Sequence, residues 1–456
     1  MTINKKVITY GTFDLFHIGH YRLLERAKKL GDFLIVGITS EEYDKARGKL
    51  NVQQSLTERI ENVRKTNLAD LIIVEEYEGQ KIEDIKKYNV DIFAIGSDWI
   101  GKFDYLKEYC EVVYLERTRE ISSTELRNKK FGILKGGIVG YGRIANRFVE
   151  EARYVSGINM EGVFGRNKAK ADNFMETYKL AFSTTDYNEL LDNVDVVYIA
   201  TPHDTHYEYA KKAIMNGKHV LCEKPLTLSK KDTEELYNLS ERNNVVLLEG
   251  IKTAYCPAFN RLINVVKTGI IGSLVGVSAS FTKLVSDGTR ELQYDQFGGS
   301  VTELASYVLL PGIKLFGCNY KDVFFYPVFD KKSNVDIFTT IILMYENNYV
   351  LNGTVGIKAK SEGSLIIAGT RGYIYVPSPW WRTEYFEIRN DNGEAIKRYA
   401  LQFDGEGLRY EIAELVRLVQ SGNLETHHLK REESITMSEI IEKFLLNTSW
   451  NKKQVI

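Results

Sequence analysis

The sequence predicts an α/β protein with two parallel, doubly wound sheets, followed by an α+β region with a large open, mostly antiparallel sheet. Two openings predict the parallel sheets: at residues 7–20 and 136–148 an apolar strand runs into a glycine-containing turn and then a helix. Apolar runs alternate with helical segments through both regions, as in βαβ units. Beyond residue 250 alternating apolar and polar residues favour antiparallel strands. We therefore expect three domains, 1–130, 131–250 and 251–456.

The individual elements follow from periodicity. Strands are expected where short apolar runs occur, and helices where apolar residues recur every three or four positions. The expected strands are 7–10, 33–36, 71–74, 92–95, 136–139, 194–200, 219–221, 274–280 and 337–343. The expected helices include those starting near residues 17 and 143, and the C-terminal segments 410–418 and 434–446.

Composition limits the class of protein. The 60 Lys+Arg residues balance 61 Asp+Glu residues to a net charge of -1, so no basic field exists to attract nucleic acid. No apolar run approaches the roughly 18 residues that cross a bilayer. The four cysteines are far apart and form no CxxC pair, which favours reduced thiols over disulfides or a zinc site. We expect a soluble, cytoplasmic protein that inserts in no membrane and binds no nucleic acid.

The first opening carries two histidines at the start of a helix, His17 and His20. Three residues apart, the imidazoles project on nearly the same face. The unpaired N–H groups and the positive dipole end of the helix favour phosphate there. The pair therefore suits a reaction in which charge builds on a triphosphate. A zinc pair or two solvated helix-capping histidines are the alternative interpretations.

Three ordered motifs surround this pair: Tyr10–Asp14 with His17–His20, Gly96–Trp99, and Arg117-Thr118 followed by Ile121–Thr124. Together they resemble the HxGH-type nucleotidyltransferases and, within them, the glycerol-3-phosphate cytidylyltransferases. The resemblance implies that His17 and His20 are catalytic and that Asp98 faces the cytidine. The further residues that it implies for CTP binding are Gly11, Thr12, Phe13, Asp14, Lys49, Arg59, Arg117, Thr118, Ser122 and Ser123.

The reaction implied by this resemblance is attack of a substrate phosphate oxygen on the α-phosphate of CTP, with release of pyrophosphate. Positioning and charge neutralisation would supply most of the catalysis, with Mg²⁺ bridging the phosphates. Asn67 stands where that branch often has a substrate-binding arginine. The acceptor therefore need not be glycerol 3-phosphate.

The second opening, Gly140–Ala145, is a GxGxxA pattern between a strand and a helix. In that context the glycines allow close backbone approach and the helix start meets a pyrophosphate. The next strand ends at Gly165-Arg166, where an acidic residue usually reads the ribose of NAD. Arg166 offers a cation for a 2′-phosphate instead, so NADP(H) is favoured over NAD(H). A solvated surface arginine is the alternative.

Three further segments follow in order: Ala200–His206, Glu223-Lys224-Pro225 and Phe297–Tyr307. With the GxGxxA pattern they resemble the Gfo/Idh/MocA oxidoreductases, from about residue 133 to the C-terminal helices. The resemblance implies hydride transfer in which Lys224 holds the substrate oxygen and Tyr307 acts as acid/base, helped by an ammonium that lowers the tyrosine pKa. The implied cofactor-binding residues are Gly140, Tyr141, Gly142, Arg143, Ile144, Arg166, Thr201, Pro202, His206, Glu223 and Lys224.

This second region departs from the family pattern at Phe297, Glu303 and Ala305, which leaves the substrate subtype open. No cluster of metal ligands is visible in this half, so we do not expect a zinc-dependent dehydrogenase, and we assign no residue of the chain as a metal ligand. Lys252, Lys283 and Arg290 follow strands and could bind a substrate phosphate; solvated surface cations are the alternative for each.

Fusion of the two activities suggests consecutive steps. The leading hypothesis is a bifunctional enzyme in which NAD(P)H reduces a keto-sugar phosphate to an alditol phosphate and CTP then activates that phosphate. The resulting CDP-polyol would feed teichoic-acid-like polymers or capsules. The alternatives are a reductase acting on a CDP-linked or unphosphorylated compound, and a half that serves only as a nucleotide sensor or oligomerisation module. We expect the protein to form a homo-oligomer, a dimer.

Overall fold

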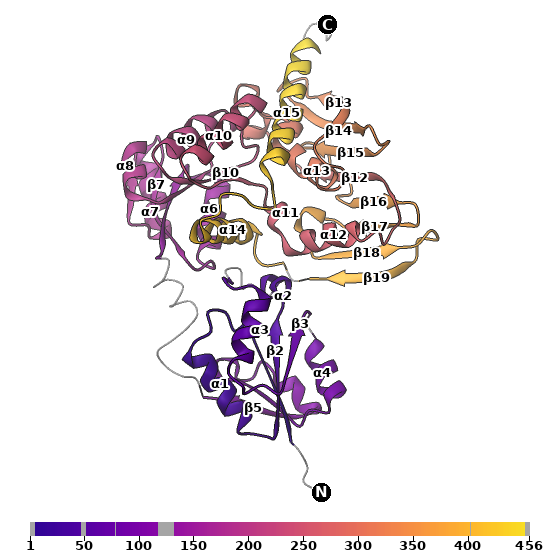
Figure 1. Cartoon of the computed structure of the whole chain (residues 1–456). Helices are drawn as coiled ribbons and strands as arrows, with labels where there is room; N and C mark the ends of the chain where they lie inside the picture. Colours follow the sequence, from indigo (N-terminus) through magenta and orange to yellow (C-terminus); the bar gives the residue numbers. More distant parts are fainter. Residues whose placement is uncertain (1–4, 47–51, 78, 117–131, 402, 452–456) are drawn as a thin grey trace. The chain divides into compact units, whose positions relative to one another are not determined.

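The computed structural model describes the chain except residues 1–4, 47–51, 78, 117–131, 402 and 452–456 (Figure 1). It consists of two compact units, Met1–Ile133 and Leu134–Ile456, which we describe separately. Among the described residues no helix is long and apolar enough to cross a membrane. All four cysteines are unpaired; Cys222 and Cys256 are buried, and Cys110 and Cys318 are partly exposed.

The first unit is a parallel five-stranded sheet in the order β3-β2-β1-β4-β5. Its strands are β1 (Lys6–Gly11), β2 (Phe33–Thr39), β3 (Leu71–Glu75), β4 (Ile92–Gly96) and β5 (Glu111–Leu115), and its helices are α1 (Ile18–Lys28), α2 (Glu41–Ala46), α3 (Leu56–Arg64) and α4 (Gln80–Tyr88). The strand order reverses between β1 and β4. In such sheets ligands bind at that point, beyond the carboxyl ends of the strands.

Both faces of this sheet are covered, which explains the nearly continuous apolar character of its strands. On β1, Val7 packs with Leu24 of α1 in one core, and the neighbouring Ile8 packs with Phe93 in the other. Helix α3 begins with a capping box in which Ser55 and Glu58 satisfy each other's backbone N–H groups. These elements fix the loop after β1, where the sequence places the histidine pair.

The second unit begins with a parallel six-stranded sheet in the order β11-β10-β9-β6-β7-β8. Its strands are β6 (Leu134–Val139), β7 (Ile158–Phe164), β8 (Phe182–Thr184), β9 (Val196–Ile199), β10 (His219–Glu223) and β11 (Leu247–Gly250). The connecting helices are α6 (Arg143–Ala152), α7 (Lys168–Tyr178), α8 (Tyr187–Asn193), α9 (His206–Met215) and α10 (Lys230–Arg242). Here the strand order reverses between β6 and β9.

An eight-stranded sheet follows in the order β13-β14-β15-β12-β16-β17-β18-β19. Only β12 and β15 pair in parallel; the other neighbours are antiparallel. The strands are β12 (Leu274–Thr282), β13 (Tyr320–Phe329), β14 (Asp336–Tyr345), β15 (Val350–Gly356), β16 (Leu365–Gly369), β17 (Gly372–Val376), β18 (Tyr385–Arg389) and β19 (Ala395–Ala400). This architecture confirms the predicted fold class.

Five helices accompany this sheet: α11 (Lys252–Tyr255), α12 (Pro257–Lys267), α13 (Ser300–Phe316), α14 (Leu408–Ser421) and α15 (Arg431–Asn451). Helix α13 lies against β12, β14 and β15, and α15 packs on α13 and on α10 of the parallel sheet (Figure 1). The chain thus returns through α14 and α15 to the six-stranded sheet, which joins the two sheets into one unit. The division of the chain into domains at 130 and 250 remains a prediction.

Candidate functional site

In the first unit the loop between β1 and α1 has an unusual backbone. Phe13 and Leu15 adopt positive φ angles of 54° and 47°, which are rare for bulky side chains. A Cβ on Gly11 would lie 3.0 Å from the Phe13 ring, so a larger residue there would push on this ring. Strain of this kind is typical of binding loops that the surrounding structure holds in place.

A buried ion pair supports the loop from below. The guanidinium of Arg59 is fully buried and its Nη1 donates to Asp44 at 3.1 Å, to the Thr12 carbonyl at 2.9 Å and to the Thr39 carbonyl at 2.8 Å. Asp44 in turn accepts from the Thr12 hydroxyl at 2.7 Å. Sequence reasoning placed Arg59 among the CTP-binding residues; the structure shows it holding the Thr12 backbone from the interior.

The histidine pair sits at the beginning of α1. His17 is the N-cap residue, and its Nδ1 accepts the N–H of Gly19 at 3.1 Å. The His17 and His20 rings stack with centroids 3.9 Å apart, and the His20 ring meets the Phe13 ring edge-on. Burial lowers the pKa of His17, which favours a neutral imidazole. The two imidazoles thus lie together at a helix N-terminus, where an anion is favoured.

The other residues predicted for this site have different placements. Asp14 is buried and accepts the backbone N–H groups of Gln53 and Gln54. Asp98 lies in the short turn Ser97–Trp99 after β4, the strand next to β1, and therefore at the same edge of the sheet. Lys49, Arg117, Thr118, Ser122 and Ser123 lie outside the described residues.

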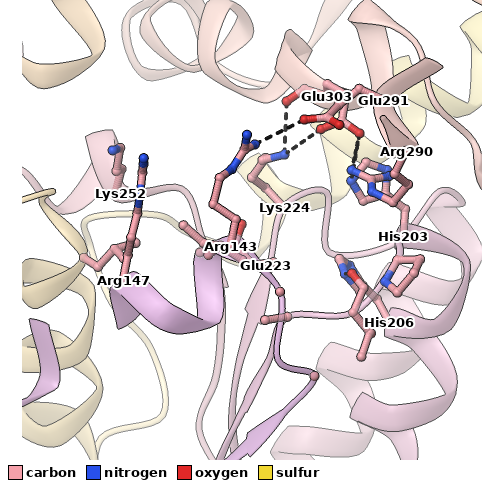
Figure 2. A pocket seen from close by; sticks show the side chains of 18 of the residues that line it. Arg143, Arg147, His203, His206, Glu223, Lys224, Lys252, Arg290, Glu291 and Glu303 are labelled. Carbon is pink, nitrogen blue, oxygen red and sulfur yellow. Dashed lines mark hydrogen bonds and ion pairs between the residues drawn. The ribbon is translucent and has the colours of Figure 1, made fainter. Parts of the chain in front are cut away.

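In the second unit a cavity of about 990 Å³ opens where the strand order reverses (Figure 2). Gly140 has φ = 101°, and a Cβ there would lie 2.8 Å from the Ala200 carbonyl oxygen. A Cβ on Gly142, the N-cap residue of α6, would meet nothing within 4 Å. The first turn of α6 is therefore open to the cavity, with room for a diphosphate at its N–H groups. These residues fit a dinucleotide cofactor.

The cavity continues past the end of β7. A Cβ on Gly165 would lie 2.1 Å from the Tyr141 ring, so the tyrosine covers the glycine backbone. Arg166, the next residue, is exposed and lines the cavity. At the β9 end, Thr201, Pro202 and His206 also line it. The cofactor-binding residues predicted from the sequence therefore meet along one groove.

A charged cluster forms the inner part of the cavity (Figure 2). The Lys224 Nζ donates to the Glu303 carbonyl at 3.1 Å and lies 3.8 Å from its carboxylate, which Arg290 also pairs. The His203 Nε2 lies 3.7 Å from the same carboxylate. Burial alone would raise the pKa of Glu303, but His203, Lys224 and Arg290 hold it at about 2. Glu303 is thus ionised and fixes Lys224 in the cavity.

Behind the cluster lie buried groups with raised pKa values. The Tyr198 hydroxyl donates to Glu223 at 2.6 Å, and burial raises the pKa of Glu223. Tyr307 lines the cavity, and burial together with Glu223, Glu411 and Glu303 raises its pKa well above its usual value. This corrects the expectation that a neighbouring ammonium lowers the tyrosine pKa: burial is the largest cause of the shift, and the nearby carboxyl groups act in the same direction.

Comparison with known proteins agrees with this geometry. Residues 8–129 match a family model described as cytidylyltransferase-like, and residues 134–251 match the oxidoreductase family with an NAD-binding Rossmann fold. The N-terminal part is 53% identical to glycerol-3-phosphate cytidylyltransferase of Bacillus spizizenii over 27% of this chain and 95% of that enzyme. The remainder is 30% identical to scyllo-inositol 2-dehydrogenase (NADP(+)) of Bacillus subtilis over 68% of this chain and 96% of that enzyme.

The chain is a cytidylyltransferase fused to a Gfo/Idh/MocA oxidoreductase. It is therefore an enzyme with two activities. A solved structure of a 3-ketoreductase from Actinomadura kijaniata matches the fold of the oxidoreductase part with a TM-score of 0.61, at 20% identity over 68% of this chain and 96% of that one. Levoglucosan dehydrogenase matches with a TM-score of 0.61, at 17% identity over 70% and 97% of the two chains.

In the oxidoreductase part, two predicted residues have structural tasks. Both ring nitrogens of His206 contact carbonyl oxygens, Pro225 at 2.9 Å and Thr201 at 3.0 Å, and burial lowers its pKa to about 4. His206 thus ties the Lys224-Pro225 turn to the end of β9. Glu223, which accepts a hydrogen bond from the Tyr198 hydroxyl, is the second residue with a structural task.

Sequence reasoning missed His203 and Glu291 in this part. His203 lies in the same Ala200–His206 motif as His206, so this motif could have indicated His203 as a site residue. Glu291 pairs with Lys283 at 3.2 Å and with Arg143 at 3.1 Å, a contact that joins α6 to the segment after β12. Lys252, Lys283 and Arg290 all line the cavity, so the surface alternative does not apply to them.

No group of three or more His, Cys, Asp or Glu side chains among the described residues could hold a metal ion. The ionic contacts of the cavity are between protein side chains of opposite charge. The charged and titratable side chains that meet in the inner part of this cavity are Lys224, Glu303, His203, Arg290 and Tyr307.

Proposed function

We propose that the enzyme makes a CDP-activated polyol by reducing a keto-sugar phosphate to an alditol phosphate and transferring a cytidylyl group to that phosphate. The charge of the oxidoreductase cavity carries the proposal. Eight cationic side chains line it against four carboxyl groups: Arg143, Arg147, Arg166, Lys224, Lys252, Lys283, Arg290 and Arg382 against Glu223, Glu291, Glu303 and Glu406. Such an excess favours a cofactor and a substrate that both carry phosphate.

In the reduction, a bound nicotinamide supplies the hydride for the substrate carbonyl carbon. Lys224, held by Glu303, binds the carbonyl oxygen and stabilises the negative charge that develops on it. Tyr307 remains protonated at neutral pH because its pKa is raised, and it donates its proton to that oxygen. An alkoxide is basic enough to take a proton even from such a tyrosine.

The NADP(H) preference rests on Arg166. It follows β7, where an NAD-binding site usually presents an acidic residue to the ribose, and it is exposed to the cavity. Its guanidinium can pair with a 2′-phosphate. The name of the scyllo-inositol dehydrogenase specifies NADP(+), and the Actinomadura ketoreductase was solved with NADP, which supports the same preference here.

In the cytidylyl transfer, His17 and His20 donate hydrogen bonds to phosphate oxygens of CTP at the start of α1. A phosphate oxygen of the acceptor attacks the α-phosphorus, and pyrophosphate leaves. Asp98 lies at the carboxyl end of the adjacent strand, where it can contact the cytidine. We expect Mg²⁺ to enter with the triphosphate. Lys49, Arg117, Thr118, Ser122 and Ser123 complete the proposed CTP site.

The proposed product fits a role in the cell envelope. CDP-polyols donate polyol phosphate units to teichoic-acid-like polymers and capsules, and the N-terminal relatives are glycerol-3-phosphate cytidylyltransferases. We propose that both reactions occur in the cytoplasm, where CTP and NADPH are made, and that the enzyme is a homodimer.

A second candidate is a reductase acting on a nucleotide-linked or an unphosphorylated compound. The name of the scyllo-inositol dehydrogenase specifies an unphosphorylated polyol, and the Actinomadura ketoreductase was solved with TDP-benzene. In that case the cationic cavity would hold a diphosphate of the substrate, or only the cofactor.

The test compares wild-type enzyme with His20→Ala and Lys224→Ala on a panel of ketose phosphates with CTP, Mg²⁺ and NADPH. The wild type should oxidise NADPH and release pyrophosphate. His20→Ala should accumulate alditol phosphate without pyrophosphate, and Lys224→Ala should release pyrophosphate only when alditol phosphate is added. If no ketose phosphate is reduced faster than its unphosphorylated counterpart, the substrate assignment is wrong.

A further inference from the structure

The cations of the oxidoreductase cavity fall into two groups. Lys224, Lys283 and Arg290 pair with the carboxylates of Glu303 and Glu291. Arg147, Lys252 and Arg382 form the other group; Figure 2 shows Arg147 and Lys252 close together and apart from the Glu303 cluster. The three cations of the first group face two carboxylates, whereas the three cations of the second group face one, that of Glu406.

The second group is built into the fold by hydrogen bonds to backbone. The Lys252 Nζ donates to the Glu406 carbonyl at 2.8 Å, and the Arg382 Nη2 donates to the Gly405 carbonyl at 3.3 Å. The Thr253 hydroxyl donates to the Trp381 carbonyl at 2.7 Å. The segments that carry Lys252 and Arg382 are therefore joined to each other, and both cations converge on the turn at residues 405–406.

These contacts leave Lys252 and Arg382 without a paired carboxylate, although the Arg382 guanidinium also lies over the Phe403 ring, 5.0 Å from its centroid. Among the residues that the structure describes, neither Lys252 nor Arg382 has a carboxylate oxygen within 4 Å, and the buried Nε of Arg382 has no hydrogen-bond partner. The Glu406 carboxylate instead pairs with Arg147 at 3.3 Å. A buried charged group without a partner is costly. A bound anion would complete the site.

The buried carboxyl groups near Lys252 are poor substitutes for that anion. Burial raises the pKa of Glu411 well above its usual value and also raises the pKa of Glu223, which disfavours their charged forms. Both oxygens of Glu411 are buried without a hydrogen-bond partner. Burial lowers the pKa of Lys252, and a dianion beside it would favour its charged form.

The strand order indicates which end of the cavity this is. Lys252 follows β11, at one edge of the sheet and next to β10, which leads to Lys224. Arg166 follows β7, on the opposite side of β6. Parallel strands lie about 4.8 Å apart, so the ends of β11 and β6 are separated by roughly 14 Å. Lys252 therefore stands on the substrate side of Lys224, away from the adenosine end of the groove.

We propose that Lys252 and Arg382, assisted by Arg147, form the subsite that binds the phosphate group of the substrate and so select phosphorylated over unphosphorylated ketoses. The ligand class, a phosphate monoester, is inferred from the cavity geometry. The identity of the substrate that carries this phosphate rests on the proposed reductase function. The alternative ligand for these cations is the pyrophosphate of the cofactor, because Arg147 lies one turn beyond the start of α6.

The test uses the full-length enzyme with Lys252→Met, Arg382→Met and the double variant, and Lys267→Met on the exposed end of α12 as the matched control. Steady-state kinetics compare a ketose phosphate with its unphosphorylated ketose. We expect KM for the ketose phosphate to rise roughly 10- to 100-fold in the single variants with kcat little changed, the range for losing one charge-assisted hydrogen bond. KM for the free ketose and Kd for NADPH should stay constant, and Lys252→Arg should restore most of the affinity.

A binding measurement separates this subsite from the substrate assignment. Inorganic phosphate should raise the Tm of the NADP⁺-saturated wild type, and the double variant should lose that part of the shift while the Lys267→Met control keeps it. Retention of the full shift by the double variant, an equal rise of KM for both ketoses, or a weaker Kd for NADPH would overturn the subsite. If the wild type reduces no ketose phosphate but the double variant loses the phosphate shift, the subsite stands and the proposed substrate is wrong.

Discussion

The two glycines before α6 allow a sharp test of the cofactor groove, because the structure assigns them different constraints. Gly140 has φ = 101°, and a Cβ there would lie 2.8 Å from the Ala200 carbonyl oxygen, a backbone atom that cannot rotate away. The unfavourable φ of an alanine costs about 1–3 kcal/mol, and the close contact costs a similar amount. Together the two costs are about 2–6 kcal/mol, and at about 2–4 °C per kcal/mol Gly140→Ala should lower the Tm of the second unit by roughly 4–24 °C.

Gly142→Ala is the matched variant. Its φ of -76° is ordinary, and the added Cβ meets no atom within 4 Å, so stability should be unchanged. The Cβ would nevertheless stand at the N-terminus of α6, where we place the cofactor diphosphate. Loss of one charge-assisted hydrogen bond to that diphosphate would weaken NADPH binding by roughly 10- to 100-fold.

The assay combines thermal unfolding with isothermal titration of NADPH on the full chain, and pyrophosphate release serves as the internal control for the first unit. Gly140→Ala should lose both stability and affinity, and Gly142→Ala affinity alone. The reasoning would be refuted by a Gly140→Ala enzyme as stable as the wild type, or by a Gly142→Ala enzyme that binds NADPH normally.

Three further predictions concern charge and proton transfer. Arg166→Asp should weaken NADPH binding by roughly 1–3 kcal/mol and shift preference towards NADH; titration with both cofactors checks this, and an unchanged ratio would make Arg166 a bystander. Tyr307→Phe should lower the reductase kcat by about 10²–10⁴-fold, and Lys224→Ala should lower it at least as much. Deuterated NADPH shows whether hydride transfer limits kcat. If it does and Tyr307→Phe keeps full kcat, Tyr307 is not the acid. Burial raises the pKa of Glu249 from 4.5 to about 7, so the stability that its protonated form contributes is present below pH 4.5 and is lost as pH rises from there to about 7. Glu249→Gln should therefore show a smaller fall in Tm than the wild type between about pH 4.5 and 7.5, and equal falls would contradict the assignment.

The sequence predicted most strands of both parallel sheets because they are apolar runs, and it predicted the glycine turns because their glycines have specific tasks. It did not predict β5, which is partly exposed, the three-residue β8, or β11. At Gly140 a side chain would strike Ala200, and at Gly11 it would strike the Phe13 ring. These steric constraints act between neighbouring elements, so they can be recognised from a short sequence motif. The same motifs placed the histidine pair, Lys224 and Tyr307 in their respective sites.

The charge environment could not be predicted in the same way, because it depends on residues far apart in the chain. Tyr307 was expected to be acidic beside Lys224, but Glu303 and the buried Glu411 surround it as well. Arg59 was read as a cation for phosphate, although three contacts with Thr12, Thr39 and Asp44 hold it in the interior. Tertiary packing decides which charged side chains pair with each other, and the spacing of residues in the sequence does not show these pairs.

Mass spectrometry can show whether the two activities act in succession on one small molecule. The enzyme is incubated with a ketose phosphate, CTP, Mg²⁺ and NADPH that carries deuterium on the transferred position. We expect the wild type to form a CDP-alditol with one deuterium on carbon, and we expect His20→Ala to stop at the deuterated alditol phosphate. A deuterated nucleotide-linked or unphosphorylated product, with no labelled CDP-alditol, would rule out this succession.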